Sequence, residues 1–430
     1  MAVGDDNRRR RWLAWVFIAL GGVVIALFML GFHHGEEWAR IGRERILGIS
    51  PWWFLLITPL TLGGIRYLTL RFMPEASGSG IPQVMAVTER PTSRAQVTGR
   101  WLLSPLGTLF KLITVCVGML AGGTVGREGP AVQIGASLMS SWSQLLRKIT
   151  IPHRMIVVAG AATGLAAAFS TPLAGVMYAF EEFLWRRRYR AGAIVAICIA
   201  VATLTSWLLT HDRQFFDITN DAPVMPPWWG MLTLAVLCGL LAGAMGWLMM
   251  HGLPRLLPAP RSPIHGGLIA AGLGLVLAVI GIWSGGLSMG SGNDTSAMLL
   301  DPTAIIETHV GSIGFVKALS TTITFGTGIP AGILTPSLAI GGGFGYDFAL
   351  LTGLDDARQL LVLFGMTAFL AGVIRTPVTT ALMAAEMSGF HAFGTELLLC
   401  ALIGCYLAKA IMRESVYEVA LHRILKPQQK

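Results

Sequence analysis

The chain has 430 residues, of which 53% are hydrophobic and only 13% are charged. Soluble domains carry about 25% charged residues, so this composition excludes an ordinary soluble protein and predicts an all-α polytopic membrane protein. The net charge of +9 comes from termini and loops, where it indicates membrane orientation and contact with anionic lipid, and we expect no nucleic-acid partner. The five cysteines lie in apolar segments without a CxxC pair, so they imply neither a metal site nor a disulfide framework.

The first apolar span covers residues 12–32, which is too long for the core of a cleavable signal peptide. By the positive-inside rule, the arginines at 8–11 place the N-terminus in the cytoplasm. The mixed-charge segment 33–50 is interpreted as a loop that leads to a second span at 52–72. The first polar interruption of an apolar run follows at residues 77–82, with the sequence SGSGIP.

The apolar run that begins at Trp101 is interrupted by Gly126, Arg127, Glu128, Gly129 and Pro130. An ionised side chain at the bilayer centre costs about 2.5 to 3.5 kcal/mol, so a buried glutamate here predicts a functional site. The two glycines permit irregular backbone, and the proline is compatible with the first turn of a helix. We therefore expect a helix N-terminus inside the membrane that carries a carboxylate.

The next span, residues 155–183, ends in Glu181 and Glu182, directly before a cluster of arginines. This end is expected to face the cytoplasm, which places Glu182 at the cytoplasmic mouth. Another Gly/Pro interruption occupies residues 328–336. Spans of the second half are predicted near residues 228–250, 266–283, 313–325, 358–374, 378–390 and 394–412.

Two sets of positions recur in the two halves at nearly one offset. They are Gly126, Pro130 and Gly135 with Gly332, Pro336 and Gly341 (332 minus 126 is 206), and Thr171, Pro172 and Glu181 with Thr376, Pro377 and Glu386 (376 minus 171 is 205). Broken helices at corresponding positions are typical of inverted-repeat transporters. We expect a single transmembrane domain over residues 1–430, with repeat 1 at about 52–210, repeat 2 at about 228–412 and a short cytoplasmic tail at 413–430.

The interruptions at 78–82, 126–130 and 332–336 are each expected to start a helix inside the membrane. Free N–H groups and the partial positive charge of a helix N-terminus favour an anion there. Ser79 adds a hydroxyl donor, and Glu128 is expected to compete with the anion until a proton neutralises it. An enzyme is disfavoured, because a serine nucleophile needs a histidine base and the histidines lie in loops or near span ends.

With these interruptions the chain resembles the CLC family of chloride channels and proton-coupled chloride exchangers, whose signatures are GSGIP, GREGP and GxFxP. The first two are complete, whereas the third reads GILTP, with Leu334 in place of phenylalanine. Gln83 and Ala131 also depart from the acidic residue and the threonine that are common in the family.

The resemblance implies that Glu128 is the gate and Glu182 the internal proton-transfer residue, without metal or cofactor. It also implies a chloride site built from two hydroxyls and several backbone N–H groups: Ser79, Gly80, Ile81, Ile333, Leu334 and Tyr417. Each side chain keeps a plainer interpretation. Glu128 could pair with Arg127 or Lys111, Glu182 could pair with Arg186, Ser79 could only cap its helix, and Tyr417 could be an interfacial anchor.

The resemblance further implies a homodimer with a complete pore in each subunit, in the plasma (inner) membrane, with both termini cytoplasmic. Family channels generally keep the gating glutamate but lack the internal one. The presence of both Glu128 and Glu182 therefore favours proton/chloride exchange over a passive voltage-gated chloride channel. A fluoride/proton exchanger is a further alternative, disfavoured because such relatives usually depart from the serine and tyrosine pattern.

Overall fold

Helices make up the regular structure that the computed structural model describes, which covers residues 2–89, 102–145, 151–184, 192–210, 216, 223–301 and 312–425. The helices of the first half are α1 (Ala2–Ile49), η1 (Pro51–Trp53), α2 (Phe54–Phe72), η2 (Pro74–Ala76), α3 (Ile81–Glu89), α5 (Pro105–Leu120), α6 (Glu128–Leu145), α7 (His153–Phe169), α8 (Pro172–Tyr178), the π-helical segment η3 (Ala179–Leu184) and α9 (Gly192–Thr210).

The helices of the second half are α10 (Trp228–Trp247), η4 (Leu248–Gly252), α11 (Leu253–Leu256), α12 (Pro263–Trp283), α13 (Asn293–Leu300), α14 (Ile313–Thr327), α15 (Leu334–Thr352), η5 (Asp355–Ala357), α16 (Arg358–Ile374), α17 (Pro377–Ser388), η6 (His391–Phe393), α18 (Gly394–Ile411) and α19 (Val416–Leu425). Within the described residues, seven helices are long and apolar enough to cross a membrane. The prediction of an all-α polytopic membrane protein is therefore confirmed.

The basic residues that support the predicted orientation fall outside this description. They are the side chains of Arg8, Arg9, Arg10 and Arg11, the residues Arg90, Arg94 and Arg100, and the cluster Arg186, Arg187, Arg188 and Arg190. The predicted orientation of the chain therefore stays a prediction.

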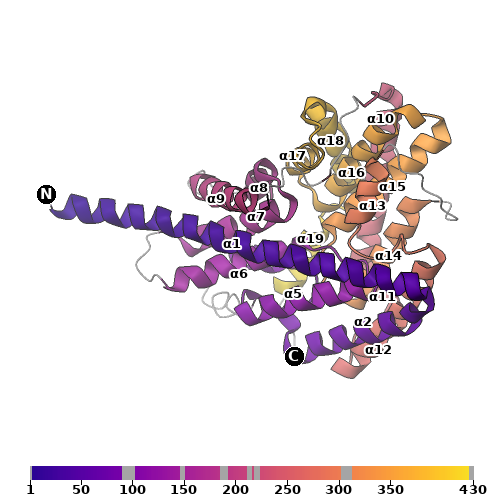
Figure 1. Cartoon of the computed structure of the whole chain (residues 1–430), viewed down its shortest axis with the longest axis horizontal. Coiled ribbons are helices and arrows are strands. Elements are labelled where there is room, and N and C mark those ends of the chain that lie inside the picture. Colours follow the sequence, from indigo (N-terminus) through magenta and orange to yellow (C-terminus); the bar gives the residue numbers. More distant parts are fainter. Residues whose placement is uncertain are drawn as a thin grey trace.

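The first helix corrects one prediction. Residues 33–49, interpreted as part of a loop, continue α1 as regular helix, and α1 runs along most of the molecule (Figure 1). This segment contains no proline, and Arg40 pairs with Glu37 and Glu44 at the i,i+3 and i,i+4 spacings that stabilise helices. The prediction ended the helix where the apolar residues had covered one bilayer thickness. It could not detect that the helix continues, because the charged residues that follow pack against other helices.

Helix α16 lies at the centre of the second half. In the most apolar stretch of this span, 94% of the residues are buried. In the other six candidate spans, the buried share of the corresponding stretch lies between 28% and 50%. Small residues allow this enclosure. A Cβ on Gly341 of α15 would lie 2.2 Å from Gly365 O of α16, and one on Gly135 of α6 would lie 2.2 Å from Gly160 O of α7. Such close approach of backbones is typical of helix packing in membranes.

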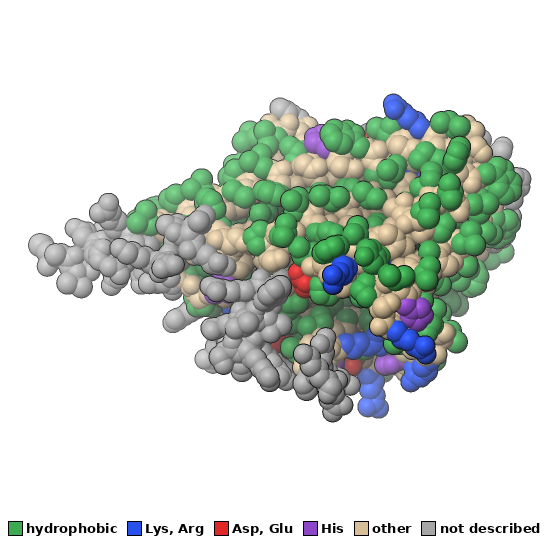
Figure 2. All heavy atoms as spheres, turned by 90° about the horizontal axis from the view of Figure 1, so that it is seen from below, with side chains coloured by type: hydrophobic (Ala, Val, Ile, Leu, Met, Phe, Trp, Pro, Cys, Tyr) green, Lys and Arg blue, Asp and Glu red, His purple; other side chains and the backbone are tan. Residues whose placement is uncertain are grey.

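The outer surface is apolar, as expected for contact with lipid. Figure 2 shows hydrophobic side chains over most of one face, with lysine and arginine gathered toward one edge. Large apolar side chains are strongly exposed on several helices, including Leu351 at 86%, Tyr406 at 75% and Leu268 at 66%. In water a surface of this kind would be an aggregation hazard, so its natural neighbour is the bilayer.

Most of the segment predicted as a short tail, residues 413–430, is helical and packs against the rest of the protein. Residues 416–425 form α19, which packs against α3, and Val416, Tyr417, Val419 and Leu421 are buried. The apolar residues of this short segment lie on one helix face, so they fold back into the protein.

Candidate functional site

The three Gly/Pro interruptions meet at one place inside the protein. Gly126 and Gly332 form an isolated antiparallel bridge, in which each backbone N–H donates to the other residue's carbonyl at 3.0 and 2.9 Å. Gly78 N donates to Ile329 O, and Ala331 N donates to Gly78 O, both at 3.3 Å. These bonds satisfy backbone groups that lie between helices, which is why irregular backbone is tolerated here.

Glycine lets the helix starts approach one another closely. A Cβ on Gly129 would lie 2.1 Å from Ser79 Oγ, and one on Gly126 would lie 2.9 Å from Gly332 O. Gly80 has a φ of +106°, a conformation that other residues rarely adopt. Larger side chains at these positions would separate the starts of α3, α6 and α15.

Glu128 is the first residue of α6 and is fully buried. Its Oε2 accepts a hydrogen bond of 3.3 Å from the backbone N–H of Thr335, in the first turn of α15. Its Oε1 has no hydrogen-bond partner. The carboxylate therefore lies at a helix N-terminus, in the kind of place that a free anion would occupy.

Ser79 and Tyr417 bring two buried hydroxyls to the same region. Ser79 Oγ approaches the Tyr417 hydroxyl, and Tyr417 also interacts electrostatically with Glu128. The side chains are only 7% and 1% exposed, and neither hydroxyl makes a hydrogen bond. Two unpaired O–H donors in an apolar interior would both be satisfied by an anion. Ser79 is thus not a helix cap, and Tyr417 is not an interfacial anchor.

The predicted backbone donors lie at the starts of two of these helices. Ile81 is the first residue of α3 and Gly80 directly precedes it, whereas Leu334 is the first residue of α15 and Ile333 is its N-cap. The first N–H groups of a helix have no intrahelical acceptor, so they remain available to an anion. Gln83, which departs from the family pattern, donates from Nε2 to Ser77 O at 2.7 Å and thereby braces the first interruption.

Glu182 lies in the π-helical segment η3, at the end of α8, and is half-buried. Its proposed alternative partner, Arg186, lies outside the described residues. Among the residues that the structure describes, it interacts electrostatically with the carboxylates of Glu418, Glu181 and Glu89. Glu182 therefore belongs to an acidic group at one end of α8.

Glu181 and Glu386 cap helix starts reciprocally, since each carboxylate accepts hydrogen bonds from the first turn of the opposite helix. The Glu181 carboxylate accepts from the backbone N–H groups of Val378 and Thr379, in the first turn of α17, at 3.1 and 2.7 Å. The Glu386 carboxylate of α17 accepts from Leu173 and Ala174, in the first turn of α8, at 2.9 and 2.8 Å. The start of α17 is thus capped by a carboxylate from η3, which continues α8, and the start of α8 is capped by a carboxylate from α17.

Two buried lysines form a pair of loop supports that the sequence analysis did not identify. Lys111 Nζ donates to Gly78 O at 3.0 Å, in front of α3. Lys317 Nζ is surrounded by the carbonyls of residues 287–290 at 2.9 to 3.4 Å, in front of α13. The two lysines are 206 residues apart (317 minus 111), the offset already found for the glycine motifs. That offset was the signal that could have identified Lys317 and its loop.

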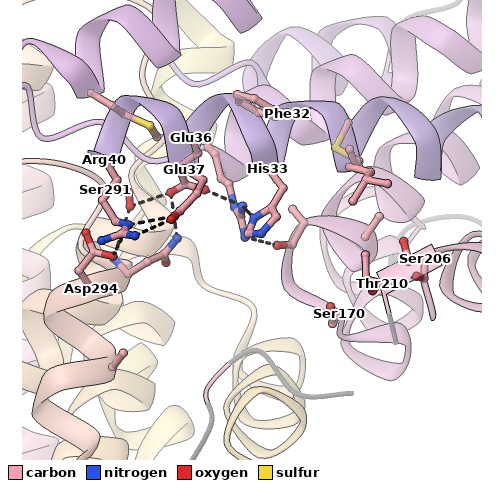
Figure 3. Close-up of a pocket in the computed structure, with 18 of the residues that line it drawn as sticks. Phe32, His33, Glu36, Glu37, Arg40, Ser170, Ser206, Thr210, Ser291 and Asp294 are labelled. Atoms are coloured by element: carbon pink, nitrogen blue, oxygen red, sulfur yellow. Dashed lines mark hydrogen bonds and ion pairs between the residues drawn. The ribbon is translucent and has the colours of Figure 1, made fainter. Parts of the chain in front are cut away.

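A polar cavity of about 280 Å³ is lined in part by Arg127, the residue that precedes Glu128 (Figure 3). Arg127 pairs there with Glu36 Oε2, contacts His33 Nδ1 at 2.9 Å and donates to Ala168 O at 2.7 Å. Glu36 Oε1 in turn accepts from Ser291 Oγ and Asn293 Nδ2 at 2.9 and 3.0 Å. This network ties α1 to the start of α6 and to the start of α13.

Glu36→Gln is expected to destabilise the protein by about 3 kcal/mol, because it leaves the buried guanidinium of Arg127 without its counter-charge. Glu37→Gln is the matched control. Glu37 is one residue away and its side chain is 41% exposed, so loss of its pair with Arg40 should cost less than about 1 kcal/mol. Thermal unfolding of the detergent-solubilised protein compares the two variants. Equal losses would show that the Arg127 network contributes no more than a surface ion pair.

Within the described residues, no group of three His, Cys, Asp or Glu side chains could hold a metal ion, and the five cysteines are free. Ser77 Oγ donates to Gly328 O at 2.8 Å. The described geometry therefore consists of anion donors and carboxylates.

Comparison with known proteins agrees with this geometry. The family model described as "Voltage gated chloride channel" matches residues 64–413. A curated relative from Vibrio parahaemolyticus, named "H(+)/Cl(-) exchange transporter ClcA", is 28% identical over 96% of this chain and 89% of its own length.

The solved structure of a slow cyanobacterial Cl-/H+ antiporter superposes with a TM-score of 0.78 at 22% identity, covering 97% of this chain and 99% of that chain. A CLC-type fluoride/proton antiporter follows at 0.72 and 20% identity, covering 95% and 97%. The family model spans most of the chain, and this protein belongs to the voltage-gated chloride channel (CLC) family.

Proposed function

We propose that this chain exchanges chloride for protons across the plasma (inner) membrane, as a transporter and not an enzyme. The observation that carries the proposal is the Glu128 carboxylate at the start of α15, beside the unpaired hydroxyls of Ser79 and Tyr417. An ionised carboxylate competes with chloride for these donors, whereas a protonated one does not. Chloride can therefore replace Glu128 when a proton neutralises it, which couples the two ions.

Glu182 is proposed as the internal proton-transfer residue. It lies just beyond the C-terminal end of α8. There it is half-buried among carboxylates, which attract protons from the surface. Its position next to the predicted cytoplasmic arginine cluster would give protons an entry separate from the gate. The name of the Vibrio relative, an H(+)/Cl(-) exchange transporter, supports the coupling of chloride transport to protons.

We propose a homodimer with one pore per subunit, both termini in the cytoplasm, and two repeats at about 52–210 and 228–412. Helices α8, α9 and α18 expose large apolar side chains, including Leu173 at 59%, Leu208 at 58% and Leu402 at 48%. This face would pack against a second copy, with the remaining apolar surface in contact with lipid. Cross-linking in native membranes through a cysteine at Leu402 tests this contact.

The proposed function is tested by proton movement in proteoliposomes under an imposed chloride gradient. Voltage is clamped to zero with a potassium ionophore and symmetric potassium. We expect protons to move uphill, driven by chloride. Chloride flux without proton movement would identify a passive channel, and uphill proton movement driven by fluoride but not chloride would identify a fluoride/proton exchanger.

Tyr417→Phe is expected to weaken chloride binding by about tenfold, because it removes one hydrogen bond to an ion at nearly constant volume. Isothermal titration calorimetry with chloride measures the change. Tyr346→Phe is the control, since Tyr346 is also buried but lies 12 residues into α15, about 18 Å along the helix, where its ring packs under Arg358. An unchanged chloride affinity in Tyr417→Phe would remove Tyr417 from the site.

A further inference from the structure

Tyr178 carries a buried hydroxyl that the proposed site does not use. It is the last residue of α8, its side chain is fully buried, and its hydroxyl has no hydrogen-bond partner. A phenylalanine would fill the same space without removing a polar group from water. Because buried polar groups in proteins are almost always hydrogen-bonded, this hydroxyl points to a partner outside the protein chain, such as water.

The position of Tyr178 links the two predicted ends of the proton route. Glu182 follows four residues later, in the π-helical segment that continues α8, a type of distortion that is frequent at functional sites. Tyr178 interacts electrostatically with both Glu182 and Tyr417. Tyr417 in turn lies beside Ser79 and reaches Glu128. Glu182, Tyr178 and Tyr417 thus form a series of polar groups, which leads from the half-buried Glu182 carboxylate to the fully buried Glu128.

The ring of Tyr178 is held in place by packing. It meets the ring of Phe183 edge-to-face, with 5.4 Å between the ring centroids. The reciprocal caps described above fix the start of α8 against α17, and Figure 1 shows these helices side by side. A fixed ring directs its hydroxyl to one place, which a transfer step between fixed groups requires.

We propose that the Tyr178 hydroxyl relays protons between Glu182 and the chloride site at Ser79 and Tyr417. A phenol both accepts and donates a hydrogen bond. A proton released by the Glu182 carboxyl, directly or through water, binds the phenolic oxygen while the phenol's own proton leaves through the chloride site to the Glu128 carboxylate. Tyr178 stays neutral, Glu128 becomes neutral and Glu182 becomes a carboxylate, which a proton taken up on the side of Glu89 and Glu418 neutralises again. This inference rests on the proposed function, because it takes Glu182 as the proton donor.

The test is Tyr178→Phe, which removes the oxygen and keeps the ring contact with Phe183. In proteoliposomes we expect proton flux to fall about tenfold while chloride flux persists, so that fewer protons move per chloride. Tyr346→Phe, a buried tyrosine outside this route, should leave the ratio unchanged. Chloride binding equal to wild type shows that Tyr178→Phe is folded.

Glu182→Gln is measured in parallel to separate the two proposals. If it abolishes proton flux while Tyr178→Phe keeps the wild-type ratio, the relay is wrong and the proposed function stands. If proton and chloride flux fall together in Tyr178→Phe at a constant ratio, the hydroxyl supports packing and the relay is likewise overturned. If Glu182→Gln keeps its proton flux, the assignment of Glu182 fails, and the relay fails with it.

Discussion

Glu128→Gln is expected to abolish proton transport and to make chloride flux independent of external pH. Glutamine cannot ionise, so its neutral amide competes only weakly with chloride for the N–H of Thr335, and it cannot carry a proton. An anion at a helix N-terminus is stabilised by up to about 2 kcal/mol. Loss of this competitor should therefore raise chloride flux at neutral pH by about tenfold, as measured with a chloride electrode in proteoliposomes.

The control for this variant is Glu396→Gln. Glu396 also lies in the first turn of a helix, α18, but it is half-buried and far along the chain from the interruptions. Its replacement should leave both the proton flux and the pH dependence of chloride flux unchanged. Persistent uphill proton movement in Glu128→Gln would show that the gate is a different residue.

Several features of this site could be predicted from the sequence because each has a local cause. Glycine and proline clustered with polar residues inside an apolar run favour a break in the helix, so the starts of α3, α6 and α15 could be expected from residues 78–82, 126–130 and 332–336. A carboxylate in an apolar run identified Glu128 without any knowledge of the fold. The extension of α1 was missed because the charges of residues 33–49 find partners on other helices, such as Asp294 for Arg43.

Contacts between the halves could not be predicted, because an offset shows which positions correspond and not which ones touch. Gly126 and Gly332 correspond and also bond to each other, whereas Lys111 and Lys317 correspond but support separate loops. The reciprocal caps of Glu181 and Glu386 likewise depend on α8 and α17 lying side by side. Tyr178 carried no signal at all, since only burial shows that its hydroxyl is unpaired.

Glu182→Gln is expected to reduce proton flux to the background of empty vesicles while chloride flux continues. Glu182 lies in η3, outside the helix starts of α3 and α15 that carry the predicted chloride donors, so its neutral replacement should not disturb chloride binding. An amide keeps the size of the carboxylate but cannot accept and release a proton at neutral pH. The measurement is the ratio of proton to chloride flux under a chloride gradient at zero voltage.

The adjacent carboxylate provides the matched control. Glu181→Gln removes a charge one residue away, but Glu181 caps α17 through Val378 and Thr379. A weakened cap should lower stability by about 1 kcal/mol and leave the flux ratio unchanged. Glu181→Gln would then change the thermal stability, whereas Glu182→Gln would change the number of protons moved per chloride. A loss of coupling in Glu181→Gln that equals the loss in Glu182→Gln would mean that the acidic end of α8 acts as a whole, and that no single carboxylate transfers the proton.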